Sequence, residues 1–493
     1  MDRTNLAGRT CQRACVKYRL MPVVLCLTIL LLASACGAAD RSSPVTPSKV
    51  SPDDIAVPTP TVSPTPDMRS HQSASSSRQP TPVPAGTIPA AMPHFFSFGV
   101  FNAPGATTVL DEMRAHNGTA FAFRYYFLSG SMNAGQGWEQ EGSQSEQSPL
   151  AYMQESARHG YMPVFIYTDL CRSASSRPAS ACAGNRQAQE AQETASLADP
   201  RVMKTYYAHW ELLLRQVRSF SKPVLIIVEP DLWGHLQRTA GEQADAAHIP
   251  ASVRSSGYAA ATFPDTAQGF AWTLLHMRDT EAPNALLALN AVSWASGIDI
   301  ASETRSDLDL ASLVQKQAQF LKSAGLAGNP ANVSRWDVMA SDVMGPGGEE
   351  AGHSGIWWDR HNRTFPNFTR ALSFLSLLCQ ATHLRMVLWQ VPVGNQYFQT
   401  MNNTPGHYQD NRAEYILNHV ADFANVGIIA VLFGSRTGSS SFDARHDGVT
   451  NPSPVVSFQC DLCNSHASAY ADDDGGYLRL FIGLYMAYPL AVQ

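Results

Sequence analysis

From residue 94 onward, short apolar runs alternate along the chain with longer amphipathic segments. Short apolar runs predict buried strands, and amphipathic segments predict helices packed on them. Strands are expected at residues 95–101, 120–127, 162–168, 224–229, 285–292, 336–343, 385–391 and 427–433. Helices are expected after each of them, at 107–116, 150–159, 200–220, 265–281, 308–324, 367–382, 411–424 and 477–488.

Eight strand–helix units predict an α/β fold, the closed (β/α)₈ or TIM barrel. An open doubly wound sheet is the alternative, but it has no reason to stop at eight strands. The helix-to-strand links are short, as at 117–119, whereas the strand-to-helix links are long. The long links cover residues 128–149, 169–198, 232–264, 344–366, 392–410 and 434–476. In such barrels this is the face that carries the active site.

The apolar run Val224–Val228 ends abruptly in Glu229, Pro230 and Asp231. A continuous β-branched run is typical of a strand buried on both faces. Alternation along the strand predicts that the two carboxylates lie on one side, with Pro230 ending the ladder between them. Burying unpaired carboxylates is costly, so we expect both in a wet cleft. The alternative is a structural role, as a helix cap or a partner of an arginine.

Residues 1–35 predict an export signal, because a basic leader precedes the apolar stretch 21–32. The following Leu32-Ala33-Ser34-Ala35-Cys36 resembles the lipobox of bacterial lipoproteins, which implies lipid attachment at Cys36. Secretion with cleavage nearby and an uncleaved anchor are the alternatives. All three place the protein outside the cytosol, either extracellular or at the cell envelope.

Residues 36–90 are rich in Ser, Pro and Thr, a composition that cannot bury a core. We expect this segment to be a disordered tether that holds a barrel domain at 91–493 away from the membrane. The chain carries a formal charge of −6, and the leader has five basic residues against one acidic residue, so the rest has −10. This acidic balance argues against nucleic acid as a partner and is compatible with neutral substrates.

Cysteine use is consistent with export. Cys171 could pair with Cys182, and Cys460 with Cys463, each closing a short loop outside the cytosol. Cys379 lies in an apolar helical run and is expected to be a buried free thiol. No second ligand pair accompanies the Cys-x-x-Cys segment, so we expect no metal there, and no cofactor motif occurs elsewhere.

Several side chains on the long-loop face are expected to bind substrate. Arg124 and Tyr126 end the second strand, and Trp389 and Gln390 end the seventh. Flat aromatic rings stack on sugars, so aromatics crowding one face favour a carbohydrate ligand. The aromatics in the long loops are Trp138, Trp233, Trp294, Trp357, Trp358 and Tyr397. His407 lies in a loop rich in hydrogen-bonding groups and is a further candidate.

The segment Ile226–Leu232, with its Glu-Pro-Asp, resembles glycoside hydrolase family 6, a family of inverting cellulases. The resemblance implies that Asp231 is the general acid and that Asp169 supports it. Tyr167 and Asn290 are expected to bind substrate, and 286–294 takes the place of the next strand. Asn290 departs from the family, which usually has an aspartate there. The expected barrel also has more strands than the distorted barrel of that family.

The chemistry of glycoside cleavage predicts the same roles, since it needs one protonated carboxyl and one carboxylate. We expect Asp231 to be the acid, with Glu229 and Asp169 disfavouring its ionised form. Asp342, at the end of the sixth strand, is the leading second carboxylate, and the alternative is an acid that only starts a loop. The predicted function is an exported monomeric hydrolase of a polysaccharide, with a β-glucan as one candidate. Gln390 argues for the alternative, a glycan-binding lipoprotein without activity, because many retaining barrel glycosidases have their nucleophilic glutamate there.

The lipid anchor at Cys36 gives a first testable prediction. The wild-type protein is expected to partition with membranes, and Cys36→Ser is expected to release it or to leave it unprocessed. Fractionation followed by mass determination of the mature N-terminus measures both effects. Equal membrane retention and unchanged processing in the variant would remove the lipoprotein interpretation.

Overall fold

A computed structural model describes most of the barrel domain. The described residues are 86–130, 138, 148–171, 186–343, 358–359, 361–391, 400–401, 404–405, 412–434 and 477–492. The predicted signal peptide lies outside them, as do most of the tether and Cys36, Cys182, His407, Cys460 and Cys463. No helix within the described ranges is long and apolar enough to cross a membrane.

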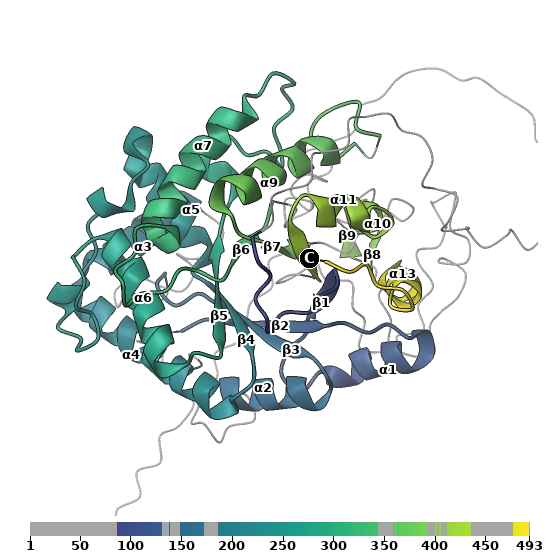
Figure 1. The fold of residues 1–493 in the computed structure, drawn as a ribbon, viewed down its shortest axis with the longest axis horizontal. Helices are drawn as coiled ribbons and strands as arrows, with labels where there is room; N and C mark the ends of the chain where they lie inside the picture. The colour runs from purple at the N-terminus through teal and green to yellow at the C-terminus, as the bar shows by residue number, and fades with distance from the viewer. Residues whose placement is uncertain are drawn as a thin grey trace, which may run out of the picture. The chain divides into compact units, whose positions relative to one another are not determined.

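The eight predicted strands form a closed parallel barrel, which confirms the predicted fold class (Figure 1). The strands are β1 (Ser97–Phe101), β2 (Phe123–Leu128), β3 (Met162–Tyr167), β4 (Val224–Val228), β5 (Ala285–Asn290), β6 (Val338–Ser341), β7 (Met386–Val391) and β10 (Ile428–Phe433). Each pairs with the next in this order, and β10 pairs with β1 to close the ring. The two-residue strands β8 (Thr400–Met401) and β9 (Thr404–Pro405) form a separate antiparallel pair.

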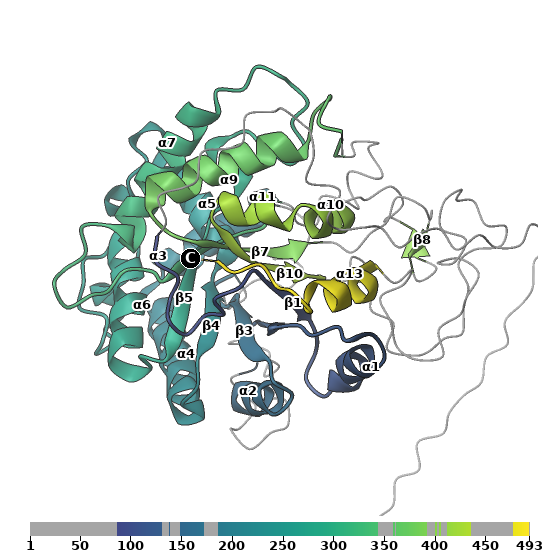
Figure 2. The same ribbon diagram turned by 45° about the vertical axis from the view of Figure 1, so that its right-hand side comes forward.

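Helices surround the ring of strands, as the turned view in Figure 2 also shows. They are α1 (Thr107–Asn117), α2 (Pro149–Arg158), α3 (Arg186–Ala198), α4 (Pro200–Phe220), α5 (Pro230–Ala240), α6 (Ala267–Glu281), α7 (Leu310–Leu321), α9 (Phe368–Thr382), α10 (Arg412–Asn418), α11 (Val420–Asn425) and α13 (Tyr477–Tyr485). Short turns η3 (Gly241–Gln243), η4 (Ala246–His248), η5 (Arg254–Ser256), η6 (Ser293–Ser296) and η7 (Lys322–Leu326) lie between them. Cys379 in α9 is buried and free, as predicted.

Barrel closure depends on close approach at Gly99, in the middle of β1. This residue pairs with Leu432 of β10 on one side and with Phe123 of β2 on the other. A Cβ at position 99 would lie 2.6 Å from Cβ of Phe123 and 2.4 Å from the Leu432 side chain. Only glycine therefore fits without moving the neighbouring strands apart.

Helix α4 shows how a local signal fixes an element. The Asp199 side chain caps its first turn by accepting a hydrogen bond from the Arg201 backbone N–H at 2.8 Å, and Pro200 is its first residue. Proline is favourable at this position because the first helical N–H groups have no partner within the helix. The apolar face of α4, including Trp210 and Leu214, is fully buried. The observed bounds equal the predicted range 200–220.

Two helices occur where long loops are expected. Helix α3 lies within 169–198, and α5 begins at Pro230 and extends into 232–264. Pro230 does not merely end the strand, because it opens α5, whose Leu232 and Leu236 are buried. The strand itself ends at Val228, and Glu229 has a left-handed backbone with φ of 43°. The expectation that Glu229 and Asp231 share one side of a strand is therefore wrong, since Asp231 lies in the first turn of a helix.

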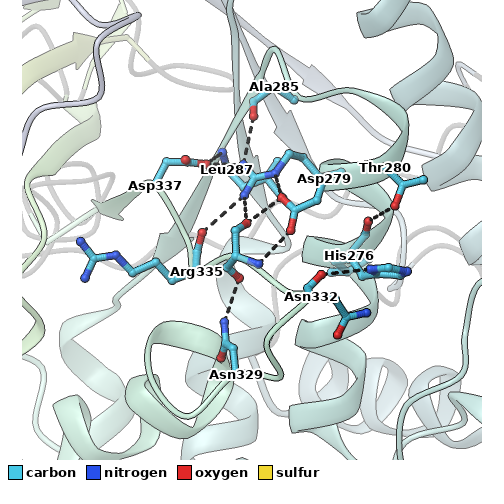
Figure 3. Close-up of polar contacts among 12 residues, drawn as sticks. His276, Asp279, Thr280, Ala285, Leu287, Asn329, Asn332, Arg335 and Asp337 are labelled. Carbon is cyan, nitrogen blue, oxygen red and sulfur yellow. Dashed lines mark hydrogen bonds and ion pairs between the residues drawn. The ribbon is translucent and has the colours of Figure 1, made fainter.

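A polar cluster ties α6 to the starts of β5 and β6 (Figure 3). Its centre is the buried Arg278 of α6, which donates to the Ala285 carbonyl at 3.0 Å and forms ion pairs with Asp279 and Asp337. Asp337 also accepts from the Leu287 backbone N–H at 2.8 Å. These contacts lie at the amino ends of the strands, the end of such barrels that serves stability.

Arg278→Leu is therefore expected to lower the free energy of unfolding by roughly 2–4 kcal/mol, since it leaves two carboxylates without their buried partner. Arg201→Leu is the matched control, because the Arg201 side chain is 95% exposed, and its effect should stay within about 0.5 kcal/mol. Denaturant unfolding monitored by circular dichroism measures both variants. Equal effects at the two positions would contradict the stabilising role of the cluster.

Candidate functional site

The carboxyl ends of β5, β6 and β7 bring Asn290 and Trp389 together. Trp389 Nε1 donates to Asn290 Oδ1 at 2.9 Å, and Asn290 Nδ2 donates to the Pro230 carbonyl at 3.1 Å. Strand β6 lies between β5 and β7, so the bond between the two side chains runs through the barrel interior. Both side chains are buried, and they form the floor beneath the carboxyl-end face.

Glu229 is buried at the end of β4, where it holds the chain that follows β3. Its Oε1 accepts hydrogen bonds from the backbone N–H groups of Asp169 and Leu170, at 2.8 and 2.9 Å. Burial raises the pKa of the Glu229 carboxyl well above its usual range, and the charges of Glu193 and Asp169 add to this shift. A non-glycine residue at φ of 43° is strained, and such strain is typical of functional sites.

Asp169 and Tyr167 lie on the helix side of β3. The Tyr167 hydroxyl donates to Asp169 Oδ2 at 3.2 Å, and His209 Nδ1 lies 3.0 Å from the same oxygen. The Tyr167 ring packs edge-on against Trp210 of α4, and Tyr167 is fully buried. The expectation that Tyr167 contacts substrate is therefore wrong, and Asp169 anchors the segment that Glu229 also holds.

Asp342 and Asp231 form the electrostatic centre of the site. Burial raises the pKa of the Asp342 carboxyl to about 7, and the charges of Asp231 and Asp299 also raise it while Arg186 lowers it. Asp342 directly follows β6. Asp231 Oδ2 accepts a hydrogen bond from Gln189 Nε2 at 2.9 Å. The two carboxyl groups thus differ in environment although each feels the charge of the other.

Trp294 is the half-buried aromatic beside these acids. The Arg186 guanidinium lies 4.4 Å from its ring centre, and the His235 ring centre lies 5.0 Å away. The ring packs over Gly234 of α5, where a Cβ would lie 2.7 Å from it. Trp294 therefore lies against α5, the helix whose first turn carries Asp231.

Three of the predicted substrate-binding residues have structural roles instead. Arg124 is fully buried outside the barrel and pairs with Glu155 of α2 at 2.8 Å, and Tyr126 of the same strand packs near Tyr152 of α2. Trp233 is 1% exposed and donates to the Val228 carbonyl at 2.8 Å. These predictions are wrong because all three side chains face the helix layer.

Other aromatics of the predicted rim are also buried. Trp138 and Trp358 are 7% and 5% exposed, and their rings pack edge-on against Tyr167 and Phe368. Gln390 is partly buried with a left-handed φ of 54°. Trp357, Tyr397 and His407 lie outside the described residues. Cys171 is disulfide-bonded, and Cys182 lies outside the described ranges, so their pairing stays a prediction.

Three further residues belong to the site but were not predicted from the sequence: Gln189, Glu193 and His235. Gln189 Nε2 donates to Glu193 Oε1 at 2.9 Å, and His235 Nδ1 lies 2.6 Å from Glu193 Oε2. Burial raises the pKa of the Glu193 carboxyl. The run 186–193, rich in Gln, Ala and Glu, favours a helix, and this signal could have placed Gln189 and Glu193 on one face.

Neither a metal-binding group nor a cavity among the described residues indicates another site. Within the described ranges, no group of three His, Cys, Asp or Glu side chains could hold a metal ion. One cavity of about 480 Å³ lies at the amino ends of the strands, beside Phe95 and Met162. Another of about 590 Å³ lies between α7 and α9. Neither cavity is lined by a carboxylate, so the acids at the carboxyl ends remain the candidate site.

No protein-family model matches the chain, and no curated protein matches it. Similar solved structures include YdhT from Bacillus subtilis, with TM-score 0.36 and 10% identity over 71% of this chain and 82% of that chain. The GH113 β-mannanase AaManA from Alicyclobacillus acidocaldarius has TM-score 0.36 and 9% identity over 80% and 96%. A GH5-4 broad specificity endoglucanase from an uncultured bacterium has 0.38 and 10% over 79% and 94%. TM-scores this low support no conclusion about function.

The resemblance of Ile226–Leu232 to glycoside hydrolase family 6 is wrong. No family model matches the chain, that of glycoside hydrolase family 6 included. The complete ring of eight strands also differs from the distorted barrel with fewer strands that the resemblance implies. The roles of the acids therefore depend on their own geometry.

The raised pKa of Asp342 predicts a pH-dependent effect on stability. An aspartate has a pKa near 3.9 in the unfolded chain, so between about pH 4 and pH 7 the folded protein binds the extra proton. Wild type should lose stability as pH rises through this window, by up to about 1.4 kcal/mol per pH unit. Asp342→Asn, which cannot ionise, should avoid this loss.

The free energy of unfolding of Asp342→Asn minus that of wild type should therefore grow from pH 4 to pH 7 and stay constant above it. Urea unfolding at several pH values measures this difference. Asp307→Asn, at an exposed position, is the control. A difference that does not change between pH 4 and pH 7 would show that Asp342 carries no raised pKa.

Proposed function

We propose that the barrel hydrolyses O-glycosidic bonds in a polysaccharide, with Asp342 and Asp231 as its two catalytic carboxyl groups. The observation that carries the proposal is the raised pKa of Asp342 beside Asp231 at the carboxyl ends of the strands. Glycoside cleavage needs one carboxyl group that keeps its proton near neutral pH and a second that is ionised. Environments that treat two neighbouring acids differently assign these roles.

In this proposal Asp342 is the general acid, and its proton goes to the leaving glycosidic oxygen as the bond to the sugar breaks. Asp231 is the carboxylate, because the Gln189 amide donates to it and such donors favour the ionised form. It either activates water or attacks the anomeric carbon. These roles reverse those expected from the sequence, in which Asp231 is the acid. Trp294 offers a flat ring beside the acids for a sugar to stack on.

A glycan-binding protein without activity is the second candidate. Gln390 supports it, because an amide at the end of β7 can hydrogen-bond a hydroxyl but cannot act as a nucleophile. Glu229 supports it too, since one of its oxygens is already used by two backbone N–H groups. The leader and Cys36 support export with a lipid anchor, which would place either protein at the cell envelope.

Two substitutions test the proposed roles. Asp342→Asn and Asp231→Asn should each lower turnover of unactivated polysaccharide by a factor of about 10² to 10⁴. An aryl glycoside whose leaving group needs no protonation should restore much of the rate in Asp342→Asn, but not in Asp231→Asn. Reducing ends released from β-glucan, mannan and xylan measure the first effect, and Asp307→Asn is the control.

The outcomes separate the two candidates. If wild type releases no sugar from any of these glycans yet binds one, the binding protein replaces the hydrolase. If wild type is active and Asp342→Asn keeps full activity on polysaccharide, the acid is assigned wrongly. Glu229→Gln is then the next variant to test, because Glu229 is the other site carboxyl with a strongly raised pKa.

A further inference from the structure

Helices α3 and α5 face each other through two pairs of polar side chains. Gln189 and Glu193 are four residues apart on α3, and Asp231 and His235 are four residues apart on α5. Residues with this spacing lie on one face of a helix, one turn above the other. The two pairs therefore meet in register, with Gln189 opposite Asp231 and Glu193 opposite His235.

Three hydrogen bonds connect these four side chains. His235 Nδ1 lies 2.6 Å from Glu193 Oε2, Gln189 Nε2 donates to Glu193 Oε1 at 2.9 Å, and the same Nε2 donates to Asp231 Oδ2 at 2.9 Å. Both acceptors are carboxyl oxygens, so the chemistry of the partners fixes which end of the amide faces them. Each hydrogen of one amide nitrogen thus serves a different acid.

The two ends of this hydrogen-bonded network differ in burial. Glu193 and His235 are 2% and 1% exposed, so they form a buried joint between the helices. Gln189 and Asp231 are partly exposed, toward the candidate site. The buried pair fixes the position of Gln189, and of the other three side chains in this network Gln189 is the one that donates to the carboxylate of Asp231.

The amide also lies between two acids that repel each other. The charge of Asp231 raises the pKa of the Glu193 carboxyl, so the two acids are close enough to interact. A neutral group that donates to both lowers the cost of having them side by side. A leucine there would remove both donors, and a glutamate would add a third negative charge.

We infer that Gln189, held by the Glu193–His235 pair, is a positioning residue that fixes the orientation of the Asp231 carboxylate. This inference rests on the proposed function for its effect on turnover, but not for its effect on Asp231 itself. Two acids interact with Asp231: Glu193 on α3 and Asp342 after β6. His235 on α5 contacts Glu193. Asp299 and Arg186 act in turn on Asp342.

The experiment titrates the Asp231 carboxyl in the full chain without substrate. Aspartate labelled with ¹³C at the carboxyl carbon gives one resonance per residue, and Asp231→Asn identifies the relevant one. In Gln189→Leu the titration midpoint of Asp231 should move up by about 1 pH unit, the usual effect of losing a hydrogen bond to a charged group. In Gln189→Glu it should move further up.

Gln192→Leu is the matched control, because Gln192 lies on the same helix and bonds only Ser196 of α3 among the interactions seen. In Gln192→Leu the titration midpoint of Asp231 should equal that of wild type. Gln189→Asn keeps the amide on a shorter side chain and should give an intermediate shift, which a merely structural role would not produce. Gln189→Ala serves if Gln189→Leu does not fold.

Turnover provides the second readout. In an active enzyme the acidic limb of the pH–rate profile should move with the midpoint, while kcat falls and KM changes little. An unchanged midpoint in Gln189→Leu would overturn the inference, whatever the activity. A shifted midpoint in a protein that hydrolyses no glycan would support the inference and refute the proposed function.

Discussion

Closure of the barrel requires β1 to pair with both β2 and β10, and Gly99 lies where these three strands meet. A side chain there would push the strands apart and open the ring. In an open sheet the carboxyl ends of the first and last strands would no longer lie side by side. Because the ring is closed and parallel, the carboxyl ends of all eight strands meet on one face. Asn290 and Trp389 come from strands far apart in sequence and contact each other for this reason.

The fold was predictable because burial on both faces leaves a clear mark in the sequence. All eight strands are short apolar runs, and α4 carries its own cap at Asp199. Helix α5 was not predicted, because a proline after a strand can end the strand or open a helix, and local sequence does not decide between them. Here Leu232 and Leu236 pack inward and the helix forms.

The site was only partly predictable. Asp231 and Asp342 were both candidates from the sequence, and their charges interact in the structure, but their environments depend on contacts that the sequence does not display. Burial is the main cause of the raised pKa of Asp342. The charge of Asp231, which is far from Asp342 in the sequence, raises this pKa further. Likewise, Trp233 and Trp294 look alike in sequence, yet one packs beneath the helices and the other lies beside the acids.

The Arg278 cluster stabilises the amino ends of β5 and β6, while the candidate acids occupy the carboxyl ends. The contacts that stabilise the barrel and the candidate acids therefore lie at opposite ends of the same strands. Loops on the acid face can change length or sequence without weakening the contacts that hold the barrel together. For protein engineering, this separation makes the barrel a scaffold in which the loops of the acid face can be redesigned while its resistance to unfolding is kept.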